Sequence, residues 1–336
     1  MALVFIRLDK IGDLVATMSV DQHPSLKNTN VIWFISKGLK WVAEKAIPPR
    51  NAIEISSSKS EWKTSYRQLL SQLRQIQPAA VVVFQAPWWV SLACWRADIP
   101  LRVSRASQWH SFIFFNHRLR QTRSRSEKHE SEYNQELLEF ALELKHEKIS
   151  PFKLQVAPDH LLLKKYELQD NQYCIVHPGM FGSALNWPQQ KYNELIEQLV
   201  KTQIVVITGT PNDERFLSEI KPRWENHPSV RILQGQLSFE ELLSLLSTAS
   251  SVIAPSTGVL HLAAALGKKS VGLYSPILAH HPRRWGPLGD QASFLLPPVD
   301  CPAKINCLGE KCSYYPCMNL ISVESVLQKL NEKPNR

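Results

Sequence analysis

The stretch SVIAPSTGVLHLAAAL, residues 251–266, combines a buried strand, a short Ser/Thr/Gly turn and a helix rich in alanine and leucine. The chain opens in the same order: ALVFIR at residues 2–7 is followed by Gly12 and by an apolar helical pattern that continues to Val20. Continuous apolar strands that alternate with helices are typical of a parallel sheet covered on both faces. These segments predict an α/β fold.

Further apolar runs of strand length fall into two series, one on each side of residue 155. They are VIWFI (31–35), AVVVF (80–84), YCIVH (173–177), IVVIT (204–208) and SVGLY (270–274). A chain of 336 residues is too long for one ordinary core. We therefore expect two doubly wound, Rossmann-like parallel-sheet domains, residues 1–155 and 156–336, with a capped helix over residues 322–330 at the end.

Ligands of open parallel sheets bind at the carboxyl ends of the strands, so three loops there are candidates for function. In the first, Ser256 and Thr257 precede the helix that contains His261. The free backbone N–H groups and the dipole at a helix start can bind phosphate, and the two hydroxyl groups can add hydrogen bonds. The alternative, which is the commoner case for such a turn alone, is that Ser256 or Thr257 only caps a core helix.

The other two loops follow the first strand of each half. Residues 177–188 (HPGMFGSALNWP) contain two glycines that let a ligand approach the backbone, although they match neither G-x-G-x-x-G nor a P-loop. This loop can equally be a long surface connection. Asp13 stands at a helix start, where its anion is stabilised and can accept a proton, or where it simply caps the helix.

Together the three loops resemble glycosyltransferase family 9, which includes the lipopolysaccharide heptosyltransferases. Residues 7–13 (RLDKIGD) look like the family's opening motif, residues 177–188 like its donor-phosphate loop, and residues 256–268 like the motif that binds the donor's diphosphate and ribose. The resemblance implies a GT-B fold with the active site in the cleft between the domains. It also implies inverting, metal-independent transfer of a sugar from a nucleoside diphosphate sugar, with ADP-heptose as the first candidate and no separate cofactor.

The resemblance also assigns roles to residues. Residues 1–155 would form the acceptor domain, in which Asp13 is the catalytic base, and residues 156–336 the donor domain, whose terminal helix packs back on the first. Leu237 would contact the nucleobase. The full set of donor residues that we expect is Ser183, Asn186, Thr208, Gly209, Leu237, Ser256, Thr257, Gly258 and His261. Two departures leave the donor sugar open: Ser256 stands where heptosyltransferases usually carry aspartate, and Leu185 where they often carry lysine.

The formal net charge of +9 favours an anionic partner. Basic residues between 102 and 129 are interleaved with aromatic ones, which suits an acceptor lobe for an anionic glycan or glycolipid, with peripheral contact to the inner membrane face. A solvated basic loop is the alternative. The acceptor residues that we expect are Lys10, Arg105, Arg118, Arg120, Lys128 and His129. We expect no nucleic-acid partner, because no RRM, KH, zinc-finger or helix-turn-helix pattern is present.

The amino terminus lacks the features of a signal peptide and no apolar run is long enough to span a bilayer, so we expect a cytoplasmic protein. Cys301, Cys307, Cys312 and Cys317 do not have zinc-ribbon spacing, which favours free thiols or an occasional disulfide over a metal site. Two alternatives to a transferase stay open: a GT-B sugar-nucleotide epimerase and a non-catalytic glycan-assembly protein that keeps the fold.

Overall fold

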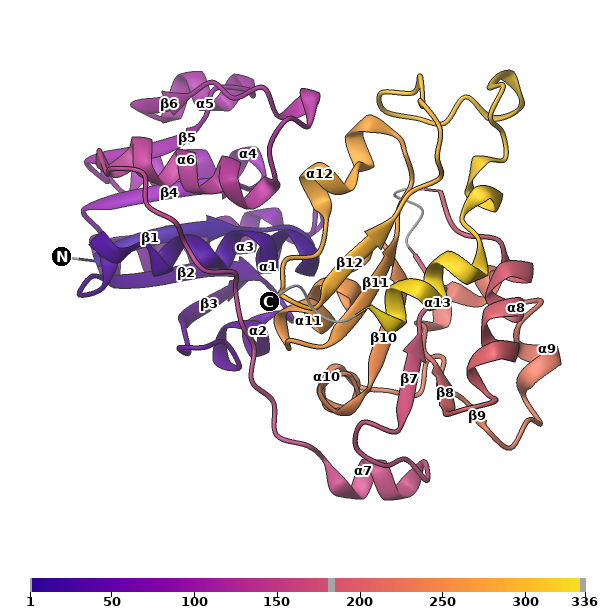
Figure 1. The fold of residues 1–336 in the computed structure, drawn as a ribbon. Helices are drawn as coiled ribbons and strands as arrows, with labels where there is room; N and C mark the ends of the chain where they lie inside the picture. Colours follow the sequence, from indigo (N-terminus) through magenta and orange to yellow (C-terminus); the bar gives the residue numbers. More distant parts are fainter. Residues whose placement is uncertain (1, 181–184, 333–336) are drawn as a thin grey trace. The chain divides into compact units, whose positions relative to one another are not determined.

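The computed structural model describes residues 2–180 and 185–332, and the chain forms two compact units (Figure 1). The first unit contains Met1–Arg123 and Glu127–Leu154, and the second contains Ser124–Ser126 and Gln155–Arg336. Each unit is built on a six-stranded sheet in which all pairs of neighbouring strands are parallel. The prediction of two doubly wound α/β domains is confirmed.

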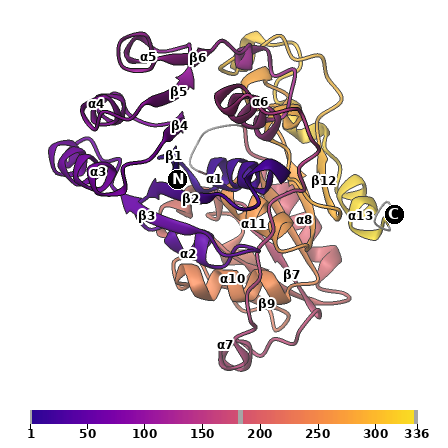
Figure 2. The ribbon, with the colours of Figure 1, turned by 90° about the vertical axis from the view of Figure 1, so that its left-hand side faces the viewer.

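The sheet of the first unit has the strand order β3-β2-β1-β4-β5-β6. Its strands are β1 (Ala2–Arg7), β2 (Asn30–Ser36), β3 (Asn51–Ile55), β4 (Ala80–Gln85), β5 (Leu101–Arg105) and β6 (His117–Leu119). Its helices are α1 (Ile11–Met18), α2 (Lys40–Glu44), α3 (Trp62–Ile76), α4 (Trp88–Arg96), α5 (Trp109–Phe114) and α6 (Glu130–Leu142). Helices α3, α4 and α5 cover one face of the sheet, and α1 and α6 cover the other (Figure 2).

Alternating side chains of the central strands serve both faces. Val4 and Ile6 of β1 belong to the core that α3 and α4 cover. Phe5, between them, packs edge-on against Trp33 and Phe84 on the other face, with ring centroids 5.2 and 5.7 Å away. This two-residue alternation with both sides buried explains why β1 reads as a continuous apolar run.

The sheet of the second unit has the strand order β12-β11-β10-β7-β8-β9. Its strands are β7 (Tyr173–Val176), β8 (Ile204–Ile207), β9 (Val230–Ile232), β10 (Ser251–Pro255), β11 (Lys269–Leu273) and β12 (Ala292–Leu295). Its helices are α7 (His160–Lys165), α8 (Gln189–Leu199), α9 (Lys221–Trp224), α10 (Phe239–Thr248), α11 (Gly258–Ala265), α12 (Pro282–Trp285) and α13 (Val323–Asn331). Because the strands are parallel, the loops that follow them gather at one edge of the sheet, which we call the carboxyl edge.

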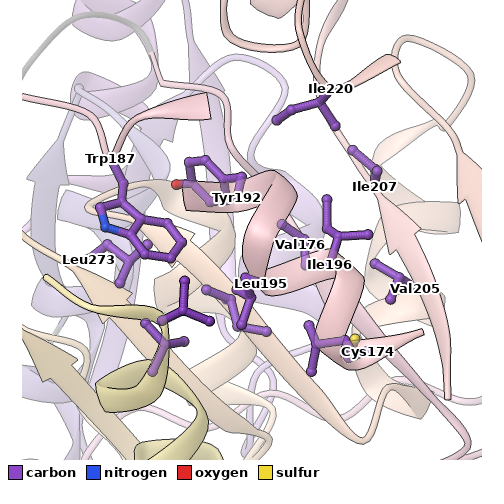
Figure 3. Packing of buried hydrophobic residues seen from close by; sticks show 14 of the residues in the cluster. Cys174, Val176, Trp187, Tyr192, Leu195, Ile196, Val205, Ile207, Ile220 and Leu273 are labelled. Carbon is purple, nitrogen blue, oxygen red and sulfur yellow. The ribbon is translucent and has the colours of Figure 1, made fainter. Parts of the chain in front are cut away.

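The core of this unit lies between the sheet and helix α8 (Figure 3). Tyr192, Leu195 and Ile196 form the buried stripe of α8 and contact apolar residues of β7 and β8. Each such side chain contributes about 1.5–3 kcal/mol when it is fully removed from water. Trp187 packs edge-on against Tyr192 and its indole N–H donates to the Ile321 carbonyl at 3.0 Å. The core therefore fixes the end of the 177–188 loop.

Helix boundaries follow local chemistry. Helix α10 begins with a capping box, in which Glu241 N donates to Ser238 Oγ at 3.2 Å. Pro188 stands at the N-cap of α8, directly before its first turn. Ser322 caps α13, whose Val323 and Val326 enter the core of the second unit. Packing of α13 against the first unit stays a prediction.

No helix among the described residues is long and apolar enough to cross a membrane.

Candidate functional site

The turn between β10 and α11 holds a hydroxyl group that lacks a partner. Thr257 occupies the N-cap position of α11 in extended conformation, yet its side chain accepts no capping hydrogen bond. Thr257 Oγ1 is buried, and no group among the described residues is within hydrogen-bond reach of it. Such an atom costs about 1–3 kcal/mol unless a ligand or water satisfies it. The interpretation of Thr257 as a side-chain cap is therefore wrong.

The start of α11 adds donors to this turn. Gly258 is the first residue of the helix, and the backbone N–H groups of a helix's first turn have no acceptor within the helix. Together with the helix dipole they favour a negatively charged group. His261 is buried one turn further on. Burial raises the pKa of the Tyr274 phenol, and the Ser256 side chain acts in the opposite direction. The turn is thus suited to bind phosphate oxygens.

The next two loops of the carboxyl edge are joined by a buried histidine. His177, directly after β7, lies 3.0 Å through Nδ1 from the hydroxyl of Thr208, directly after β8. Burial lowers the pKa of His177 to about 4, against a smaller opposing effect of Asp213, so the imidazole is neutral at neutral pH. The hydroxyl of Thr208 therefore already has a partner within the protein, and contact of this residue with the sugar donor stays a prediction.

Asp213 is a structural residue of this edge that our sequence reasoning did not find. Its Oδ2 accepts from both the N–H and the hydroxyl of Thr210, each at 2.7 Å. Its carboxyl group packs directly against Gly179, where an added Cβ would lie 2.3 Å from Asp213 Cγ. Gly179 thus allows the 177–188 loop to approach the loop after β8. The threonine and aspartate three residues apart form a capping box, a pattern that the sequence shows.

The other residues that we expect to bind the sugar donor have different surroundings in the structure. Asn186 Nδ2 donates to the Pro178 carbonyl at 2.7 Å, so this side chain closes the 177–188 loop on itself. Ser183 lies outside the described residues. Gly209 accepts from Gly235 N at 2.8 Å, which links the loops after β8 and β9. Leu237 is half-buried in the loop after β9.

In the first unit, the expected base Asp13 is held by a buried arginine. Asp13 is the third residue of α1, whose N-cap is Lys10, so Asp13 is not the capping residue. Arg7 Nη2 donates to Asp13 Oδ1 at 2.9 Å, and Arg7 Nε donates to Asp9 Oδ1 at the same distance. The Asp13 side chain keeps 21% of its surface exposed while Arg7 keeps 3%. The buried Arg7 therefore orients the Asp13 carboxylate, which stays accessible to solvent.

Glu130 of α6 completes this network from a distant part of the sequence. Its Oε1 accepts from Arg7 Nη1 at 3.3 Å and also from Arg123 Nη1, and all three side chains are buried. Burial lowers the pKa of Arg7, but the three carboxylates outweigh it and raise that pKa above its ordinary value. Burial raises the pKa of Asp9 to about 7 despite the opposing effect of Arg7. The sequence placed Arg7 in the opening motif and Arg123 among the basic residues of the expected acceptor lobe, but it did not indicate Glu130 or this network.

Four of the six expected acceptor cations have partners within the first unit. Arg118 donates to the Phe115 carbonyl at 2.7 Å, Arg105 to Gln85, and Lys128 pairs with Glu136. His129 caps α6: its Nδ1 accepts from Ser131 N at 3.1 Å.

The other two cations, Lys10 and Arg120, are exposed. Acceptor binding by any of the six stays a prediction.

The four cysteines near the carboxyl end lie together. Cys301, Cys307, Cys312 and Cys317 line one cavity of about 10 Å³, and all are free thiols. Burial, and then the neighbouring thiols, raise the pKa of Cys317. Within residues 2–180 and 185–332, no three side chains of the metal-binding types are placed to hold a metal ion.

Comparison with known proteins shows which family the chain resembles. A "putative glycosyltransferase" of Haemophilus influenzae is 27% identical over 352 aligned residues, which cover 98% of this chain and 95% of that protein. The family 9 glycosyltransferase structure from Veillonella parvula aligns with a TM-score of 0.80 at 16% identity, covering 99% of this chain and 97% of that one. E. coli ADP-heptose LPS heptosyltransferase II aligns with a TM-score of 0.76 at 20% identity, covering 98% of both chains.

The fold of two six-stranded parallel sheets matches these GT-B structures. The family model "Glycosyltransferase family 9 (heptosyltransferase)" matches residues 66–314, which contain the 177–188 loop and the β10–α11 turn. The chain is a glycosyltransferase and belongs to glycosyltransferase family 9.

Proposed function

We propose that this enzyme transfers a heptose or a related sugar from a nucleoside diphosphate sugar to a hydroxyl group of an anionic glycan. ADP-heptose is the first candidate donor and the lipopolysaccharide core the first candidate acceptor, because relatives named lipopolysaccharide heptosyltransferase 2 match parts of the chain. The observation that carries the proposal is the buried, unpartnered hydroxyl of Thr257 beside the first-turn amides of α11. A diphosphate would satisfy both.

The proposed reaction divides the work between the two units. The Asp13 carboxylate takes the proton from the acceptor hydroxyl, and the oxygen attacks the anomeric carbon from the face opposite the leaving group. The bond between that carbon and the diphosphate oxygen breaks, and the nucleoside diphosphate leaves as an anion. The amides at Gly258 and Val259, with the hydroxyl of Thr257, would stabilise the developing negative charge. Arg7 positions Asp13 and does not itself touch the substrate.

Two steps test this proposal. Thermal shift with a panel of nucleoside diphosphate sugars should single out the donor, since a bound ligand stabilises the fold according to its occupancy. With that donor, Asp13→Asn should keep donor affinity and lower the transfer rate by roughly 10²–10⁴-fold, the usual contribution of a general base. Asp98→Asn is the matched control, because Asp98 is exposed and its positive φ suits asparagine.

Three outcomes bear on the proposal in different ways. Near-normal turnover in Asp13→Asn would remove this residue from the mechanism. Release of free nucleoside diphosphate without a transferred sugar would favour the epimerase alternative. His261→Ala should weaken both donor binding and turnover, and unchanged values would contradict the placement of the diphosphate. We also expect transfer to continue in the presence of EDTA, as the family resemblance implies.

A further inference from the structure

The outer surface of α4 and α5 exposes large apolar side chains. We call this set the α4–α5 patch: Trp88 (41% exposed), Trp95 (47%), Trp109 (61%), Phe112 (59%) and Ile113 (63%). Single exposed apolar residues are ordinary in folded proteins, but a contiguous group marks an interaction surface. These five fall within 26 residues of sequence and on two neighbouring helices.

The patch is continuous with the adjacent helix α3. The ring of Trp88 lies 5.5 Å from that of Trp62 in α3 and 6.4 Å from that of Trp109 in α5, measured between centroids. Trp95 lies 5.8 Å from Phe114 of α5. Helices α3, α4 and α5 lie side by side on one face of the sheet (Figure 2). The aromatic surface therefore extends across the three helices α3, α4 and α5.

The charge around the patch has one sign. Residues 62–126 contain ten lysines and arginines and a single acidic residue, Asp98. Helices α3, α4 and α5 carry no acidic residue at all, whereas α3 and α4 carry Lys63, Arg67, Arg74 and Arg96, all exposed. One of these cations lies over a ring: Lys63 Nζ is 5.9 Å from the centroid of Trp62. The surface is thus both apolar and positively charged.

We propose that this face docks the protein onto the surface of an anionic lipid bilayer, with the α4–α5 patch among the headgroups and the surrounding cations against lipid phosphates. Tryptophan suits this position because its ring is apolar and its N–H stays wet. Apolar area and attraction to anionic lipids add in such binding. A second copy of the chain is a poor occupant, because pairing this face with itself would bring like charges together. The inference rests on the proposed function, since docking would bring the enzyme to a glycolipid acceptor.

Vesicle flotation tests the proposal without any substrate. The protein should float with vesicles of equal parts phosphatidylethanolamine and phosphatidylglycerol, should not float with phosphatidylcholine vesicles, and should be released at high salt. Its tryptophan emission should shift to shorter wavelength on binding. The double variant Trp109→Ser/Phe112→Ser should bind the anionic vesicles at least about tenfold more weakly, because it removes two large apolar side chains that would be buried in the bilayer. Leu161→Ser, which changes a residue 81% exposed on α7 of the second unit, is the matched control and should bind like wild type.

A second variant tests the charge. Lys63→Glu/Arg67→Glu should also lower binding to anionic vesicles, although it leaves the α4–α5 patch intact. Failure of the wild type to float with anionic vesicles, or equal binding to phosphatidylcholine, would overturn the proposal. So would a dimer in sedimentation that the Trp109→Ser/Phe112→Ser change abolishes. Thermal shift with ADP separates the two ideas: absence of any ADP effect with vesicle binding retained would contradict the proposed function and leave the docking surface standing.

Discussion

The substitution Thr257→Val separates a ligand contact from a structural cap. In the protein without nucleotide, Thr257 Oγ1 is buried and makes no hydrogen bond to any described residue, so replacing the hydroxyl with a methyl group breaks none. Removing a buried polar group without a partner relieves part of a penalty of about 1–3 kcal/mol. The free energy of unfolding should therefore stay the same or rise by about 1 kcal/mol, where loss of a true N-cap would lower it by about 1 kcal/mol.

Nucleotide binding should change in the opposite direction. A hydrogen bond to a charged phosphate contributes about 1.5–3 kcal/mol, so the affinity of Thr257→Val for ADP should fall roughly 10- to 100-fold. Isothermal titration calorimetry with ADP measures this change, and urea unfolding without nucleotide measures the stability.

Ser270→Ala is the matched control. Its hydroxyl is equally buried and has no partner in the described part of the chain, but it lies near the amino-terminal end of β11, away from the carboxyl edge. Its ADP affinity should be unaffected, and its free energy of unfolding should stay the same or rise slightly, as in Thr257→Val. A destabilised Thr257→Val protein with unchanged ADP affinity would refute the reasoning.

Three further predictions concern residues that shape the two units. Glu130→Ala leaves two buried guanidinium groups without the carboxylate between them and should lower the free energy of unfolding by about 3–5 kcal/mol in urea titrations; a loss below 1 kcal/mol would show that this network is dispensable. Burial lowers the pKa of His177 from 6.5 to about 4, so the unfolded chain binds a proton on this residue before the folded one does. The free energy of unfolding should therefore be at its full value above pH 6.5 and should fall by about 3 kcal/mol as the pH falls toward 4. His177→Gln should lack this loss when unfolding is compared at the two pH values, and an identical pH dependence would contradict it. Gly179→Ala places a Cβ 2.3 Å from Asp213 Cγ and should lower stability by about 1–3 kcal/mol, a loss that adding Asp213→Ala should partly reverse; wild-type melting of the single variant would disprove the close approach.

The strands could be predicted from the sequence where both of their faces are buried. The runs at β1 and β4 are continuously apolar because helices cover both sides of the central sheet. Strands β3 and β6 are the edges of this sheet and β5 is next to an edge. These three strands contain the charged residues Glu54, Arg118 and Arg102, respectively. A charged residue in a run of three to five residues removes the apolar signal, so these strands could not be recognised.

The candidate site was predictable only where its chemistry is local. The β10–α11 turn follows from a strand, a Ser/Thr/Gly turn and a helix within 16 residues. The contact of Glu130 with Arg7 joins residues 123 positions apart, and no local pattern reports such a pair. Whether Thr257 caps its helix depends on the orientation of its side chain, and the sequence is identical in both cases. Only the folded structure distinguishes the two cases.

The crystal structure of the enzyme with ADP tests the central claim most directly. We predict that diphosphate oxygens lie within hydrogen-bond distance of Thr257 Oγ1 and of the first amides of α11. A nucleotide bound at another edge of the sheet, with the Thr257 hydroxyl still without a partner, would contradict it.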